Sequence, residues 1–97
     1  MRVITGKARG IVLKTPTGMA TRPTADRVKE AIFNIIAYYV YDANVLDIFA
    51  GSGALGLEAI SRGAKHATFV DNNELAIKTI KSNVNILKEN ENVTILH

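Results

Sequence analysis

The stretch VLDIFAGSGALGLEA, residues 45–59, restricts the folds open to this chain more than any other segment. An apolar run with one acid is followed by glycines at positions 51, 53 and 56 and then by an alanine- and leucine-rich segment. This order predicts a strand, a tight turn and the start of a helix. Glycines let ligand atoms approach the backbone, and a helix N-terminus offers them unpaired amides. The segment is therefore either a ligand-binding turn or a plain connection.

The same alternation continues to the end of the sequence. HATFVD, residues 66–71, predicts a second strand, and NVTILH, residues 92–97, predicts a third. Between them, residues 73–89 have the spacing of an amphipathic helix. Its buried stripe is expected to consist of Ala76, Ile77, Ile80, Val84 and Leu87. Strands that alternate with helices imply right-handed crossovers and a parallel sheet, so we expect an α/β fold with the strand order 3-2-1.

The sheet expected in residues 44–97 would be small. A parallel sheet is normally covered on both faces and rarely stops at three strands. In the order 3-2-1 the edge of the strand VLDIF would be unpaired and largely apolar, which favours pairing with another chain. We therefore expect the 97 residues to be the front portion of a larger domain. A chain of only this length is expected to self-associate through that edge, to exchange elements or to be marginally stable.

The first 43 residues have a different pattern. RVITGKARGIVL places β-branched residues on both sides of a glycine-bounded loop. This predicts a basic β-hairpin and loop in residues 1–21, with Lys7 and Arg9 at the tip of the hairpin. From Thr24 on, apolar residues recur at intervals of three and four, which predicts an amphipathic helix within residues 22–43. Its apolar stripe consists of Val28, Ala31, Ile32, Ile35, Ile36 and Tyr39.

Charge is distributed unevenly along the chain. Residues 1–29 carry seven Lys and Arg side chains and one acid, whereas residues 30–97 carry five basic and eight acidic side chains. A basic N-terminal segment followed by a mildly acidic remainder suggests a polyanionic partner. A basic face that is merely solvated would give the same numbers of charged residues.

Residue types that are rare or missing exclude several function classes. The chain has no cysteine, which excludes disulfides and thiolate chemistry and fits a reducing cytoplasm. Its two histidines, His66 and His97, are far apart in sequence, so no metal site is expected. No apolar run is long enough to span a membrane, and MRVITGKARG lacks the apolar core of a signal peptide. We expect a cytoplasmic protein.

Two carboxylates separate the possible ligands of the glycine turn. GSGALG satisfies the pattern G-x-G-x-x-G, and Asp71 lies 20 residues after Gly51, as in a dinucleotide site. Asp47, however, lies four residues ahead of Gly51, where a pyrophosphate would meet its charge unfavourably. A carboxylate there suits a cationic ligand or a turn whose amides need an acceptor, and Asp71 suits ribose hydroxyls. Ribose with a cationic group describes S-adenosylmethionine, and a NAD-type site is the alternative.

Longer motifs carry a resemblance to a known family. VLDIFAGSGALGLEAISRGA followed by ATFVDNN resembles motifs I and II of the class I S-adenosylmethionine-dependent methyltransferases. RVITGKARGIVL and RPTADRVKEAIFNII resemble, more narrowly, the RsmD-type enzymes, which methylate the exocyclic N2 of a guanine in small-subunit ribosomal RNA. The resemblance covers nearly the whole chain in the family's order. It implies an N-terminal β-hairpin and helix, followed by the first βαβαβ half of a Rossmann-like sheet, with residues 44–97 as a partial S-adenosylmethionine-binding domain.

The resemblance also assigns roles to residues. The methionine part of the cofactor and the turn beneath it would involve Asp47, Phe49, Ala50, Gly51, Ser52, Gly53 and Gly56. Asp71 would hold the ribose hydroxyls, and Asn72 would lie beside the adenine. The segment from Arg22 to Asp26, which includes Thr24, would close over the cofactor and face the target base. For Arg22 and Arg27, an equal alternative is that they lie at the start of the helix or position a phosphate without taking part in catalysis. Phosphates of ribosomal RNA, in the small subunit or its assembly intermediate, would be met by Arg2, Lys7, Arg9 and Lys14.

One departure from the family pattern limits these expectations. The family's catalytic signature, Asp/Asn-Pro-Pro followed by an aromatic residue, does not occur, because the only prolines are Pro16 and Pro23. In the family this motif orients the guanine amine toward the sulfonium methyl, and the acid expected after the third strand is missing too. We therefore expect no catalytic residue in this chain, no methyl transfer by it alone and weak or undetectable cofactor affinity. The alternative without catalysis is a basic RNA-binding module with a vestigial fold behind it.

Overall fold

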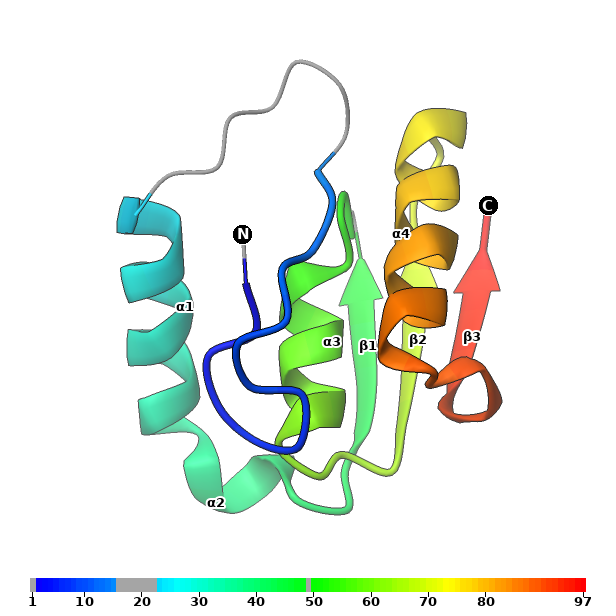
Figure 1. The fold of residues 1–97 in the computed structure, drawn as a ribbon. Helices are drawn as coiled ribbons and strands as arrows, with labels where there is room; N and C mark the ends of the chain where they lie inside the picture. The colour runs from blue at the N-terminus through cyan, green and yellow to red at the C-terminus, as the bar shows by residue number, and fades with distance from the viewer. Residues whose placement is uncertain (1, 16–22, 49) are drawn as a thin grey trace.

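A small parallel sheet forms one layer of the molecule (Figure 1). The computed structural model describes residues 2–15, 23–48 and 50–97. Its strands are β1 (Asn44–Ile48), β2 (His66–Val70) and β3 (Val93–Leu96), all parallel in the order β1-β2-β3. The α/β fold and the strand order expected from the sequence are therefore confirmed.

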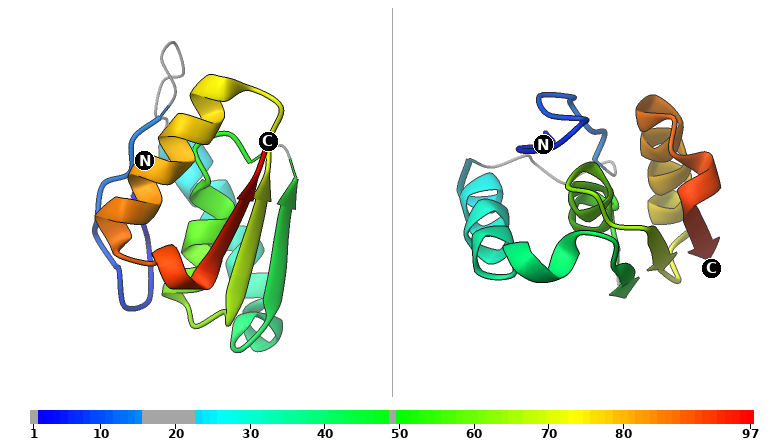
Figure 2. Two further views of the ribbon diagram at one scale, coloured as in Figure 1. Left: turned by 90° about the vertical axis from the view of Figure 1, so that its right-hand side faces the viewer. Right: turned by 90° about the horizontal axis from the view of Figure 1, so that it is seen from below.

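Two helices connect the strands and lie on the same face of the sheet (Figure 2). They are α3 (Ala54–Ser61) and α4 (Glu74–Leu87), and a short 3-10 helix, η1 (Asn90–Asn92), leads into β3. All five residues of the stripe expected in α4 are buried, so that prediction is confirmed. Side chains alternate along a strand, so the sheet presents a second face away from the helices. Leu46 and Ile48 of β1 are respectively 61% and 55% exposed there.

The N-terminal segment reverses direction without forming two strands. One antiparallel bridge joins Arg2 to Val12, and no longer strand occurs within residues 2–15. The loop between them is bonded to the end of α3 instead: the Lys7 amide donates to the Ser61 carbonyl at 2.9 Å, and the Ala8 amide donates to Ser61 Oγ at 2.9 Å. The hairpin prediction was right about the chain reversal and wrong about the strands, because the amides of Ile4 and Thr5, which a strand partner would otherwise bond, donate to the Glu58 carboxylate of α3.

Helices α1 (Pro23–Ile35) and α2 (Ala37–Val40) precede the sheet. The predicted helix forms, but its apolar stripe does not pack into the core: Val28 is 53% exposed and Ile35 is 78% exposed. The buried face of α1 carries Lys29 and Phe33, which are 2% and 4% exposed. Hydrophobic spacing identified the helix and misidentified its buried face, because an ion pair with α3 decides which side of α1 packs inward.

Helices in the described part of the chain are all too short or too polar to cross a membrane. The same residues contain no group of three or more His, Cys, Asp or Glu side chains that could hold a metal ion.

Candidate functional site

The glycine turn lies between β1 and α3, at the carboxyl ends of the strands, where open α/β sheets bind ligands. Gly51 and Gly53 have φ values of 60° and 80°, in the left-handed region that favours glycine. The Ala50 amide donates to the Val70 carbonyl at 3.1 Å, and the Gly53 amide donates to the Ala50 carbonyl at 2.9 Å. The turn is therefore shaped by its own backbone and by the end of β2.

The first and third glycines of the motif have different roles. A Cβ atom added at Gly51 would meet no atom within 4 Å, so one side of the turn is open to an approaching ligand. A Cβ added at Gly56 would lie 2.3 Å from Cε1 of Phe69. Gly56 therefore permits close packing of α3 on β2 and is not itself an open part of the turn.

Asp71 joins the turn to the start of α4. Its Oδ2 accepts a hydrogen bond from the Gly51 amide at 3.0 Å, and its Oδ1 accepts one from the Asn73 amide at 2.9 Å. These backbone bonds, the one from Gly51 first, hold the pKa of Asp71 below its ordinary value. An ionised carboxylate has about four acceptor positions, so Asp71 retains capacity for further donors such as hydroxyl groups.

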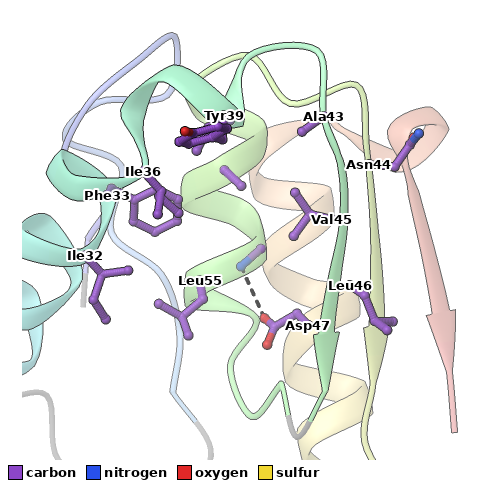
Figure 3. Close-up of a pocket in the computed structure, with 13 residues that line it drawn as sticks. Ile32, Phe33, Ile36, Tyr39, Ala43, Asn44, Val45, Leu46, Asp47 and Leu55 are labelled. Atoms are coloured by element: carbon purple, nitrogen blue, oxygen red, sulfur yellow. Dashed lines mark hydrogen bonds between the residues drawn. The ribbon is translucent and has the colours of Figure 1, made fainter.

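Asp47 lies beneath the turn and is 9% exposed. Its Oδ2 accepts from the Gly56 amide at 3.2 Å, the contact drawn as a dashed line in Figure 3. Burial raises the pKa of Asp47, the Gly56 bond opposes this rise, and the charge of Asp71 adds to it. The carboxylate thus bonds an amide in the first turn of α3. A nearby cation would also offset the cost of keeping it ionised in a buried place.

The remaining residues expected at the cofactor fall into three groups. Ala50 and Ser52 are half-buried in the turn, and Asn72 is exposed, with its carbonyl within 3.2 Å of His97 Nε2. Arg22, Phe49 and the side chain of Thr24 lie outside the described residues. Sequence reasoning missed Asn83, which is fully buried and contacts the turn. The available signal was its place as an amide on the apolar face of α4.

The four basic residues proposed for RNA do not form one cluster. Arg2 and Arg9 line a surface depression of about 340 Å³ together with Arg27 and Glu30. Lys7 instead forms an ion pair with Glu89, with Nζ 2.6 Å from Oε1. Lys14 is exposed, and its backbone is held by α4. Within the described residues, Arg2, Arg9 and Arg27 therefore come together at this depression.

An apolar groove of about 410 Å³ runs between α1, α2 and β1 (Figure 3). Residues of the exposed stripe of α1, including Ile32 and Ile36, form one wall, and Leu46 of β1 lies on the other. Asp47 also lines it. The groove lies beside the outer edge of β1, with which no strand of the described residues pairs.

Comparisons with known proteins identify the family. The family model described as conserved hypothetical protein 95 matches residues 1–97. YlbH of Bacillus subtilis is 53% identical over 88 residues, which are 91% of this chain and 48% of YlbH. Ribosomal RNA small subunit methyltransferase D of Escherichia coli is 46% identical over 88 residues, covering 91% of this chain and 44% of that protein.

A solved structure agrees with these relatives. The structure of yhhF from Escherichia coli superposes with a TM-score of 0.87 at 40% identity, covering 99% of this chain and 51% of that one. The chain spans about half the length of the curated relatives it matches. It belongs to the conserved hypothetical protein 95 family, whose members include ribosomal RNA small subunit methyltransferase D.

Proposed function

We propose that this chain forms the cofactor-binding front half of an S-adenosylmethionine-dependent methyltransferase that acts on guanine N2 of small-subunit ribosomal RNA. The observation that carries the proposal is the pair of carboxylates that bond the glycine turn and the first turn of α3 after it. Asp71 bonds the Gly51 amide and Asp47 lies buried beneath the same turn. The name of the Escherichia coli relative supports the choice of ribosomal RNA as substrate.

The described residues fit this cofactor. Asp47 is buried, so a cationic group beside it would stabilise its ionised form, and the ionised Asp71 is suited to hydroxyl donors. Open space at Gly51 leaves room for a ligand against the turn. S-adenosylmethionine, when bound, would supply the methyl group on a positive sulfonium. In this proposal the turn from Ala50 to Gly53 supports the methionine part, Asn72 lies beside the adenine, and Arg22, Thr24 and Phe49 complete the site.

The basic N-terminal segment is proposed to contact RNA. The depression lined by Arg2, Arg9 and Arg27 supports binding of phosphates there, and Lys14 is available on the same segment. Lys7 would have to leave Glu89 or bind a phosphate beside it. Such contacts release counterions and therefore weaken as salt increases. The proposed partner is ribosomal RNA or a small-subunit assembly intermediate. A protein with such a partner would work in the cytoplasm.

Methyl transfer itself is not proposed for these 97 residues. The Asp/Asn-Pro-Pro-aromatic motif is absent from the sequence, so nothing in this chain would orient the guanine amine. We expect the residues here to bind and position, and the family's catalytic motif to be required in addition. Transfer of a labelled methyl group to ribosomal RNA by this chain alone would contradict that division of roles.

The experiment that tests the proposal is a titration followed by amide resonances in NMR, which detects even millimolar affinity. S-adenosylhomocysteine should shift the amides of Gly51, Gly53 and Asp71, whereas NAD at the same concentration should not. Asp47→Ala and Asp71→Ala should each abolish the response. A response to NAD alone would favour a nucleotide-binding half-domain. Salt-dependent RNA binding that survives both substitutions, without any response to S-adenosylhomocysteine, would favour a basic RNA-binding module.

The unpaired edge of β1 supports a second, separate proposal. Within the described part of the chain, no strand pairs with the outer side of β1, which lies next to the exposed side chains of Leu46 and Ile48. Edges of this kind pair readily with another chain. We therefore propose that a chain of these residues self-associates through β1 when nothing else covers the edge.

A further inference from the structure

Asn83 is a fully buried polar side chain within the apolar stripe of α4. Its Oδ1 accepts from the Lys14 amide at 2.7 Å, and its Nδ2 donates to the Lys14 carbonyl at 2.9 Å and to the Ser52 carbonyl at 2.8 Å. A buried amide that lost these partners would keep the full cost of desolvation. The side chain is therefore fixed in one orientation by two segments that are distant in sequence.

The contact with Ser52 fixes the middle of the glycine turn. Ser52 and Gly53 share one peptide plane, whose carbonyl is held by Asn83 and whose amide donates to the Ala50 carbonyl at 2.9 Å. The Gly51 amide, two residues before that of Gly53, is held by Asp71. The Ala50–Gly51 and Ser52–Gly53 peptides of the turn are thus anchored to Asp71, which follows β2, and to α4, which leaves little freedom for the turn to change shape.

The contact with Lys14 fixes the N-terminal segment at the same point. Both backbone groups of Lys14 bond the one side-chain amide, as they would bond a neighbouring strand. Leu13, the preceding residue, is 3% exposed, so the segment is packed against the core here. One side chain on α4 therefore holds both the turn and the basic segment.

We propose that Asn83 is a positioning residue for the nucleoside-cofactor site, and that it couples the shape of the glycine turn to the placement of the basic N-terminal segment. The inference rests on the proposed function for the nature of the ligand. It predicts that a change at either segment is transmitted to the other through this amide. Asn83 itself does not touch the reacting groups.

Hydrogen exchange of backbone amides tests the positioning role without any ligand. Asn83→Ala removes all three bonds, and Val84→Ala, the next residue of the same helix, is a core variant that removes none of them. At matched global stability, Asn83→Ala should exchange the Lys14 and Gly53 amides about tenfold faster than Val84→Ala does, as expected for loss of a buried hydrogen bond. Equal exchange at these two amides in both variants would overturn the proposal.

Ligand binding provides the second readout. Asn83→Ala should weaken the response of the Gly51 and Gly53 amides to S-adenosylhomocysteine about tenfold relative to Val84→Ala, by the same loss of a buried bond. An unchanged affinity would overturn the coupling to the ligand. A wild-type chain that does not respond to S-adenosylhomocysteine would count against the proposed function, and the exchange comparison would still decide the role of Asn83.

A measurement on the wild-type chain covers the case in which Asn83→Ala does not fold. The Nδ2 protons of Asn83 should be protected from exchange, and they should shift together with the Gly53 amide when S-adenosylhomocysteine is added. Rapid exchange of these protons, or a shift at Gly53 that leaves them unchanged, would contradict the proposal.

Discussion

Nζ of Lys29 on α1 lies 3.2 Å from Oε1 of Glu58 on α3, and both side chains are almost completely buried. The same carboxylate accepts from the amides of Ile4 and Thr5 at 2.9 and 3.1 Å and from Arg62 Nε at 2.9 Å. Lys29 also donates to the Arg2 carbonyl at 2.7 Å. A single buried acid therefore joins the N-terminal segment, α1 and α3.

Glu58→Gln should destabilise the protein strongly. The substitution leaves the buried ammonium of Lys29 without its ion-pair partner, which costs about 3–5 kcal/mol in comparable buried pairs. Urea unfolding followed by circular dichroism measures the change. Glu30→Gln, an exposed acid beside Lys29 in sequence, is the matched control and should change the free energy of unfolding by less than about 0.5 kcal/mol. A loss below about 1 kcal/mol for Glu58→Gln would show that the pair contributes little.

Acid should weaken the fold through the same residue. Burial alone would raise the pKa of Glu58, but the amide of Ile4, the side chain of Arg62, the amide of Thr5 and the charge of Lys29 together bring it below its ordinary 4.5. A carboxyl with a lowered folded pKa stabilises the protein above its unfolded pKa and loses that contribution as the pH falls through the folded value. Stability measured in urea should therefore decline below about pH 4.5.

The contributions of individual acids to this decline can be separated. Because the pKa of Asp71 is lowered, its protonation below the ordinary value of 3.8 also reduces the stability of the folded protein. The pKa of Asp47 is raised, so its protonation has the opposite effect and favours the folded state. Glu58→Gln should flatten the profile between about pH 4.5 and the folded pKa of Glu58. A profile of unchanged steepness would assign the decline to other groups.

Gly56→Ala should disturb the packing of α3 on β2. The new methyl group would lie 2.3 Å from the ring of Phe69, and overpacking of this kind costs about 1–3 kcal/mol. Thermal unfolding measures the loss. Phe69→Leu should be less damaging in the Gly56→Ala background than in the wild type, because it removes the clashing ring atoms. If the two losses simply add, the clash is relieved elsewhere.

Binding of S-adenosylhomocysteine, whose ammonium group is positive, should depend on the ionisation of Asp47. Because burial raises the pKa of Asp47 above 3.8, affinity should fall as the pH decreases through that raised value, while Asp71 remains ionised. Asp47→Asn should weaken binding by about 2 kcal/mol and remove this pH dependence, since it loses a charged partner. The NMR titration repeated across pH measures both. A pH dependence that survives in Asp47→Asn would identify another titrating group.

Charges on the edge of β1 should reduce self-association. Leu46→Lys together with Ile48→Lys replaces two exposed apolar side chains on that strand, and lysine is a residue that blocks edge pairing. Sedimentation velocity should show a smaller mean mass at a given concentration than for the wild type. Leu75→Lys, at an exposed apolar position on α4, is the control and should leave the association unchanged. A monomeric wild-type chain would refute the proposal at once.

Local sequence patterns were sufficient for most of the architecture. The alternation of apolar runs and amphipathic segments after Asn44 predicted the three parallel strands and the stripe of α4, because strand and helix periodicities are properties of short segments. The glycine spacing likewise predicted the turn that Gly51 and Gly53 form with positive φ. Asp71 was singled out by its distance from Gly51, and the structure brings these two residues together.

Tertiary contacts decided what local patterns could not. The periodicity of α1 favoured burial of Val28 and Ile35, yet Lys29 is the buried residue, because Glu58 offers it a partner from another helix. Asn83 was not singled out from the sequence, and only the folded chain shows that it bonds Lys14 and Ser52. Burial of a polar side chain depends on partners distant in sequence, and hydrophobic spacing carries no information about where they lie.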